Sequence, residues 1–194
     1  MRMLTEADTP MHYCLFDTAF GEVGLAWSTD GVTRLQLPES SRSSTERRMR
    51  GRSVSTVEGH PPPPIERAID DVQRYMAGER IDFADIALDL TSVGPFHCSI
   101  YKALRRIGWG ETTTYGALAR QAGDPGAARA VGQAMGRNPV PVIIPCHRVL
   151  ASGGKAGGFS AFGGADTKQR LLALEGVRLG SEMPLLPGLL AAPR

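Results

Sequence analysis

A cysteine and a histidine stand side by side in the run Pro145-Cys146-His147-Arg148-Val149. A thiolate is a strong nucleophile, but only a few per cent of a free thiol is ionised at neutral pH. An imidazole held nearby, acting directly or through one water, raises that fraction. If such a pair stood alone, the favoured interpretation would be a buried apolar cysteine beside a solvent-facing histidine with no catalytic role. The surrounding residues must therefore decide whether this thiol is a nucleophile.

The residues just before the cysteine predict how the chain presents it. Val142-Ile143-Ile144 is a short apolar run bounded by Pro141 and Pro145, which is typical of a buried strand. Because proline lacks an N–H, regular strand pairing should stop before the cysteine. The sequence thus predicts a thiol and an imidazole at a strand end.

The composition excludes several classes of protein. The chain has 194 residues, of which 42% are hydrophobic and 22% charged, as expected for a globular protein of one or two domains. Three cysteines without framework spacing argue against a disulfide scaffold and for a reducing, cytoplasmic location. No apolar run is long enough for a membrane span. The N-terminus carries Glu6 and Asp8 and lacks an apolar signal core, so we expect no secretion signal.

The first half of the chain is expected to contain strands, a loop, a helix and a further strand. Residues 12–37 read as strands, with a hairpin turn at Thr29-Asp30-Gly31. Residues 38–64 are rich in serine, arginine and proline and predict a mobile basic loop. Ile65 to Met76 has helical spacing, and residues 86–90 alternate like a strand.

The second half is expected to be mostly helical. One helix should run from Phe96 to Ile107, and Thr114 could cap the next. After a turn at residues 123–126, a third helix should cover Ala127 to Met135, which makes a helix-turn-helix pattern. Lys168 to Leu174 should form the last helix.

The third of these helices has mostly small side chains, with Arg129 as the one long charge near its start. Small residues allow close packing against another helix. They equally suit a helix that must enter a narrow groove of a nucleic acid. The pattern leaves both interpretations open.

Six short motifs, taken in order over about residues 93–177, resemble the O6-alkylguanine-DNA alkyltransferases, also called methylated-DNA–protein-cysteine methyltransferases. They are Thr114-Tyr115-Gly116, Arg129-Ala130-Val131-Gly132, Asn138-Pro139, Pro145-Cys146-His147-Arg148-Val149, Ser160 and Leu171-Leu172-x-x-Glu175-Gly176. The resemblance implies an α+β fold. It divides the chain into a ribonuclease H-like domain (1–92), a mostly helical domain with a winged helix-turn-helix (93–180) and a flexible tail (181–194).

The resemblance also implies the chemistry. Cys146 would take the alkyl group from O6-alkylguanine, and from O4-alkylthymine, in one irreversible step that consumes the protein. His147, oriented by Glu175, would act through a water to keep the thiol ionised. Tyr115 would supply a proton or a hydrogen bond to the departing guanine. No cofactor is implied.

The implied partner is double-stranded DNA that contains O6-alkylguanine, bound through the minor groove by a monomer. The damaged nucleotide would flip out, and Arg129 would fill the space that it leaves. Further DNA contacts are expected from the two helices, at Thr114, Ala128, Ala130, Gly132 and Gln133. The substrate pocket is expected to include Asn138, Pro145, Val149, Phe159 and Ser160.

The sequence departs from the family's commoner pattern in the loop after Gly158. Ala161-Phe162 precede Gly163-Gly164, so the loop is two residues longer, and Phe159 stands where many relatives have tyrosine. Both changes fall on the expected pocket wall, where they would affect the tolerance for bulky alkyl groups.

Other classes of protein fit less well. The chain has three local Cys/His pairs, but none has the spacing of a structural zinc site, so we expect no metal. The alkyltransferase-like proteins bind lesions without repairing them and carry tryptophan in place of the nucleophile, and Cys146 argues against that alternative. An activator of the adaptive response would need a further metal-binding domain. A cysteine hydrolase would need an oxyanion hole and a separated cysteine and histidine.

Overall fold

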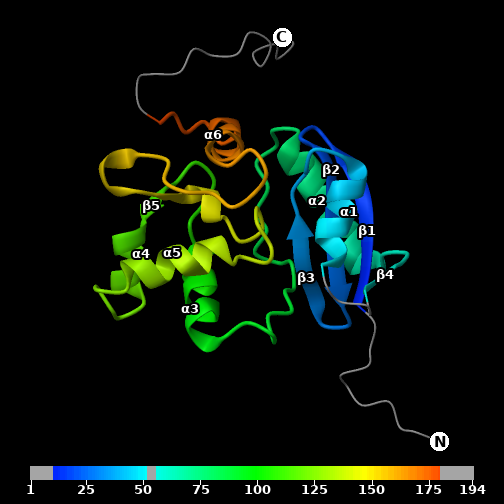
Figure 1. The fold of residues 1–194 in the computed structure, drawn as a ribbon, viewed down its shortest axis with the longest axis horizontal. Helices are drawn as coiled ribbons and strands as arrows, with labels where there is room; N and C mark the ends of the chain where they lie inside the picture. Colours follow the sequence, from blue (N-terminus) through cyan, green and yellow to red (C-terminus); the bar gives the residue numbers. More distant parts are fainter. Residues whose placement is uncertain (1–10, 52–55, 180–194) are drawn as a thin grey trace, which may run out of the picture.

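Two groups of elements, one from each half of the chain, lie side by side in the computed structural model (Figure 1). The structure describes residues 11–51 and 56–179. The first group has four strands and two helices: β1 (Met11–Thr18), β2 (Gly21–Ser28), β3 (Gly31–Gln36), α1 (Arg42–Arg50), β4 (Thr56–Glu58) and α2 (Pro63–Met76). The second has four helices and two short strands: α3 (Pro95–Leu104), β5 (Thr113–Thr114), α4 (Tyr115–Gln121), α5 (Ala128–Gly136), β6 (Val149–Leu150) and α6 (Ala165–Leu174).

The first group is built on a sheet with strand order β3-β2-β1-β4. The hairpin predicted at residues 29–31 is confirmed, since β2 and β3 pair antiparallel across it. Gly31 is required there because its φ is +144° and a Cβ would lie 2.5 Å from the carbonyl oxygen of Ala87. Residues 86–90 do not form the expected strand. Leu88 makes only an isolated bridge to Val32, so this segment follows the edge of β3 without joining the sheet.

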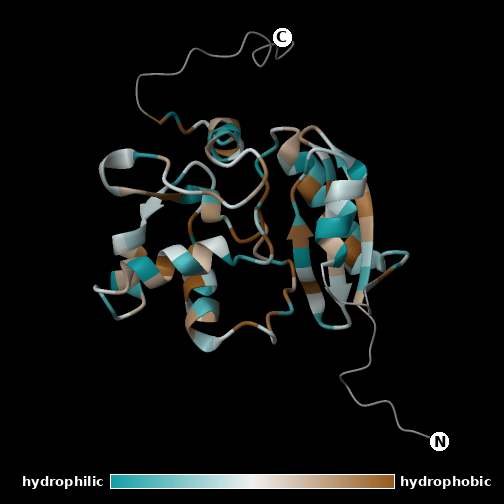
Figure 2. Ribbon diagram, in the orientation of Figure 1, coloured by the Kyte–Doolittle hydropathy of each residue, from teal (hydrophilic) through white to brown (hydrophobic). Residues whose placement is uncertain are grey.

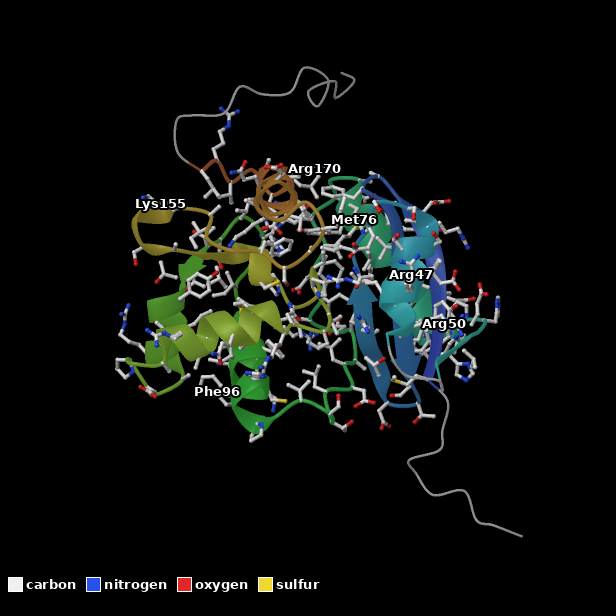
Figure 3. All side chains as sticks on the ribbon, viewed as in Figure 1. Arg47, Arg50, Met76, Phe96, Lys155 and Arg170 are labelled. Carbon is white, nitrogen blue, oxygen red and sulfur yellow. The ribbon has the colours of Figure 1, made fainter. Side chains whose placement is uncertain are left out.

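Helix α1 corrects the expectation of a mobile loop over residues 38–64. Ser41 caps the helix by accepting a hydrogen bond from the N–H of Ser44, and Thr45 and Met49 are buried. Met49 packs with Tyr13 and Ala26 on one face of the sheet. Composition misled the prediction because a single buried methionine and one cap are enough to hold a short helix that the sheet supports. Arg47 and Arg50 lie on this helix (Figure 3).

Helix α2 covers the opposite face of the sheet. Its buried side chains, including Ile65, Val72 and Tyr75, share one hydrophobic cluster with Val23 and Leu25 of β2. The same cluster continues into the second group of elements, so the two groups share a core. Figure 2 shows the hydrophobic residues of the strands and helices concentrated toward this interior.

The second group follows the predicted order of helices, with shifted ends. Helix α3 ends at Leu104, three residues before the predicted end. The cap predicted at Thr114 is confirmed, because its side chain accepts a hydrogen bond from the N–H of Ala117. Residues 142–144 do not form a regular strand. Val142 has a φ of 76°, and the segment makes only the isolated bridge between Pro141 and Ile144.

Two segments with predictions lie outside the described residues. They are the N-terminus with Glu6 and Asp8, and the tail 181–194. Within residues 11–51 and 56–179, no helix is long and apolar enough to cross a membrane.

Candidate active site

Cys146 begins a single 3-10 turn that runs to Arg148, directly after the irregular segment 140–145. Its N–H donates to the carbonyl of Ile144 at 2.8 Å, and only 6% of the residue is exposed. Nearby, Val142 holds a left-handed conformation that is costly for a β-branched residue. Such strain persists where the surrounding packing enforces it, and it often marks functional sites.

Asn138 holds this segment in place. Its amide nitrogen donates to the carbonyl of Ile144 at 2.8 Å, and its side-chain oxygen accepts from the N–H of Val140 at 3.0 Å. Asparagine often holds a turn by such side-chain bonds to its local backbone. The same side chain also acts on the thiol of Cys146, whose pKa it tends to lower. One asparagine therefore joins the end of α5 to the cysteine.

The environment of Cys146 contains opposing influences on its ionisation. Burial raises the pKa of the Cys146 thiol above its usual range, while the Asn138 hydrogen bond and the nearby charge of Lys168 act in the opposite direction. The net direction is upward. The thiol is therefore neutral in the resting protein at neutral pH, and it needs a proton acceptor to react.

His147 and Glu175, which the family resemblance brings together, form a buried pair. The His147 Nε2 atom lies 2.9 Å from Oε1 of Glu175, and both side chains are fully enclosed. Burial lowers the pKa of His147, although Glu175 acts to raise it. The imidazole is therefore neutral at neutral pH. Its Nδ1 is buried and has no hydrogen-bond partner among the described residues, so it is free to accept a proton.

Arg148 supplies the positive charge that keeps Glu175 ionised. Its Nε and Nη2 donate to the carboxylate at 2.7 to 3.1 Å. Burial by itself would raise the pKa of Glu175, but the hydrogen bonds from His147 and Arg148 lower it to about 2. The N–H of Gly110 also donates to Oε2 at 3.2 Å. The carboxylate is thus a fixed acceptor at the centre of the cluster.

Lys168 is a site residue that the sequence reasoning missed. It lies in α6, is completely buried, and donates from Nζ to the carbonyl of Val149 at 2.6 Å. Burial lowers the pKa of Lys168, and the charge of a Cys146 thiolate would raise it. A lysine in an amphipathic helix is normally exposed, so no pattern in the sequence indicated its position.

A cavity of about 410 Å³ opens beside Cys146. It brings together three of the predicted pocket residues, Asn138, Phe159 and Ser160. It also has basic walls that were not predicted, from Arg34 of β3, Arg48 of α1 and Arg137. The first half of the chain therefore contributes directly to this cavity.

Three other predicted residues lie outside the lining of that cavity. Pro145 lines a second cavity of about 570 Å³, which does not include Cys146. Val149 is fully buried, and its carbonyl already accepts from Lys168. Tyr115 begins α4 and is half-buried. Burial and the charge of a Cys146 thiolate both raise the pKa of Tyr115, so the phenol stays protonated.

The predicted DNA-contacting helix presents one open face. Arg129 and Gln133 are exposed at helical spacing on α5, and Ala128, Ala130 and Gly132 are half-buried between solvent and the core. In contrast, Ala134 is fully buried, and its carbonyl accepts from Tyr101 at 2.8 Å. Close packing thus accounts for the small side chain at Ala134. The small residues nearer Arg129 instead keep side chains from projecting far from the outer face of α5. The Thr114 side chain is used for the cap.

Fold and site together define a mixed α/β protein with one buried thiol next to a histidine–glutamate pair. Residues 95–177 match the model of the 6-O-methylguanine DNA methyltransferase DNA-binding domain. The methylated-DNA–protein-cysteine methyltransferase of Mycobacterium tuberculosis is 38% identical over 175 residues, which cover 90% of this chain and 98% of that protein. The constitutive enzyme of Bacillus subtilis is 34% identical over 164 residues, covering 84% and 93%. The chain belongs to the methylated-DNA–protein-cysteine methyltransferase family.

Solved structures agree with this assignment. The crystal structure of Mycobacterium tuberculosis OGT in complex with DNA superposes with a TM-score of 0.69 at 38% identity, covering 84% of this chain and 92% of that one. The O6-methylguanine-DNA methyltransferase of Pyrococcus kodakaraensis superposes with a TM-score of 0.65 at 26% identity, covering 86% and 99%. The mixed α/β fold is therefore the one found in these proteins.

Proposed function

We propose that Cys146 is the acceptor through which this protein repairs alkylated DNA. As a methylated-DNA–protein-cysteine methyltransferase, the protein transfers the alkyl group to its own cysteine. The observation that carries the residue assignment is the geometry around Cys146: a buried thiol, an adjacent histidine with a free Nδ1, and a cavity that reaches the sulfur.

The reaction is a single displacement at the alkyl carbon. The Cys146 sulfur forms a bond to that carbon while the bond from carbon to guanine O6 breaks, and its electrons remain on the base. The thiol proton passes through a water to Nδ1 of His147, which Glu175 orients from the other side. Tyr115, whose phenol is kept protonated by its surroundings, donates a hydrogen bond to the departing guanine. The thioether is stable, so each chain reacts once.

The substrate is O6-alkylguanine in double-stranded DNA, with O4-alkylthymine as a second lesion of the same chemistry. A base inside a duplex cannot reach a buried sulfur, so the nucleotide must flip out at a cost of a few kcal/mol. The open face of α5 supports entry into the minor groove, and the exposed Arg129 would occupy the vacated stack. Helices α4 and α5 would then act as the helix-turn-helix of a winged domain, and the β1–β4 sheet with α2 as a ribonuclease H-like domain.

Lesion binding without repair is the alternative from a different class. It would need the α4–α5 helix pair but not the proton relay, by which we mean Cys146, His147 and Glu175. The buried His147–Glu175 pair, which DNA binding does not require, favours transfer.

Intact mass after mixing with a duplex that contains O6-methylguanine tests the proposal. We expect one added methyl group per chain, located on Cys146 by peptide mapping, and no further turnover. Cys146→Ala should lose transfer but retain DNA binding, whereas Cys98→Ala, which removes a half-buried thiol away from the cavity, should transfer normally. A methyl group on Cys14 or Cys98, or steady multiple turnover, would overturn the assignment.

A further inference from the structure

Tyr75 reaches the relay from the other half of the molecule. It belongs to α2, yet its hydroxyl oxygen lies 2.7 Å from Oε1 of Glu175 and 3.2 Å from Nε2 of His147. The side chain has no exposed surface. Its ring contacts Trp109 edge-on and Phe83 at a tilt, each with ring centroids 5.4 Å apart. The phenol is therefore held rigidly at the point where the histidine and the carboxylate meet.

The hydrogen-bonding capacity of these three groups leaves one consistent arrangement. Glu175 is ionised, because its pKa is lowered to about 2, so it can only accept. Burial raises the pKa of Tyr75, so the phenol keeps its single proton. That proton is directed to Glu175, since the bond to the carboxylate is the shorter one and a carboxylate is the stronger acceptor. Only the lone pairs of the phenol oxygen then face His147.

Two acceptors consequently surround Nε2 of His147, namely Oε1 of Glu175 and the hydroxyl of Tyr75. A neutral imidazole carries one proton, and it must sit on the nitrogen that faces acceptors. Nε2 therefore carries the proton. Nδ1, which is buried and lacks a partner among the described residues, keeps its lone pair.

We propose that Tyr75 is a positioning residue for alkyl transfer, which acts with Glu175 to keep His147 as the Nε2–H tautomer and holds its ring so that Nδ1 can take the proton of Cys146. The inference rests on the proposed function of Cys146. Glu175 alone would fix the tautomer but leave the ring free to rotate about one hydrogen bond, whereas contacts to two acceptors also define the ring plane. The orientation of the proton acceptor, Nδ1 of His147, therefore depends on how α2 packs against the second half of the chain.

The charges that face His147 come from two elements, α6 with the residue that ends it and the 3-10 turn. Glu175 follows α6, Lys168 lies within it, and Arg148 and Cys146 share the 3-10 turn with the histidine. Arg148 and Lys168 both act to lower the pKa of His147, and Glu175 acts to raise it. Tyr75 adds no charge. Its removal should leave these charges and the proton on Nε2 in place, since Glu175 still accepts that proton, but it should release the ring from its fixed orientation.

The tautomer of the unmodified protein gives the first test. With ¹⁵N-labelled histidine, the chemical shifts of His147 report which ring nitrogen carries the proton, and His147→Gln identifies its signals among the four histidines. We expect Nε2–H in the wild type. A wild-type His147 protonated on Nδ1 would overturn the proposal, and this measurement needs no Tyr75 variant.

Tyr75→Phe gives the second test, because it keeps the ring packing and removes the hydroxyl. Single-turnover transfer from a duplex with O6-methylguanine, at saturating protein, should be roughly tenfold slower at pH 7. The loss should shrink toward alkaline pH, where the thiol ionises without help. The ¹⁵N spectrum should keep the Nε2–H tautomer, because Glu175 still accepts from Nε2, with the His147 signals broadened by motion of the ring.

Tyr13→Phe is the matched control. Tyr13 is also buried and also donates to a carboxylate, Glu46, at 2.8 Å, but it lies on β1 away from the relay. It should keep the wild-type rate and pH profile. An unchanged rate in Tyr75→Phe, or an equal fractional loss at every pH, would reduce Tyr75 to a packing residue. Absence of transfer in the wild type would instead refute the proposed function itself.

Discussion

Replacing Glu175 by glutamine should be among the most damaging single changes in this protein. The carboxylate is completely buried and accepts from Tyr75, His147, Arg148 and Gly110. Glutamine keeps the shape but removes the charge, and it turns one acceptor into a donor that would face other donors. Arg148, itself 6% exposed, would lose its only anionic partner among the described residues.

The size of the loss can be worked out in two ways. Removing one partner of a buried ion pair costs about 3–5 kcal/mol. The pKa of Glu175 falls from 4.5 to about 2, a difference of 2.5 units, which corresponds to about 3 kcal/mol in favour of the ionised form. The two figures agree, and each is a large part of the total stability of a domain, about 5–15 kcal/mol.

Urea denaturation at pH 7 measures this loss. We expect Glu175→Gln to lower the free energy of unfolding by about 3 kcal/mol or more. The control is Glu79→Gln, which breaks an exposed pair with Arg74 and should cost at most about 1 kcal/mol. If Glu175→Gln cost no more than the control, the charge of Glu175 would not stabilise the fold, and our account of the cluster would be wrong.

The pH dependence of the difference in unfolding free energy between wild type and Glu175→Gln gives an independent check. Because the folded pKa of Glu175 is depressed, its contribution is complete above 4.5 and is lost as the pH falls from 4.5 toward 2. The difference in unfolding free energy between wild type and Glu175→Gln should therefore decrease between pH 4.5 and pH 2. The pKa of His147 is lowered by burial, so wild-type stability should also decline as the pH drops below about 6.5.

Three further predictions concern transfer. Arg129→Ala should slow repair in duplex DNA by at least tenfold but affect reaction with free O6-benzylguanine far less, since no flipping is needed; equal losses would assign Arg129 to the fold or the pocket. Lys168→Met should raise the thiol pKa of Cys146, seen as an alkaline shift in its alkylation by iodoacetamide, because a nearby positive charge disappears; no shift would exclude that electrostatic role. His147→Ala should slow transfer more at pH 7 than at pH 10, and the same fractional loss at both would argue against a base.

Local sequence determined much of the second half of the chain. The cap at Thr114 and the adjacency of Cys146 and His147 depend on neighbours a few residues away, so residue types and spacing predicted them. The motif order also predicted the family. The same reasoning failed at α1, where a composition typical of a loop concealed a cap and one buried methionine.

The tertiary structure decided what surrounds the thiol. Tyr75 and Glu175 are 100 residues apart in the chain, and the hydrogen bond between them exists only because α2 packs against the second half of the molecule. Lys168 would be read as a surface charge in any helical pattern, yet it is buried beside Val149. Burial and long-range contacts set the pKa of each group in the relay, and neither is a property of local sequence. The candidate residues Cys146, His147 and Glu175 could therefore be proposed from the sequence, whereas their protonation states followed only from the packing of the two halves.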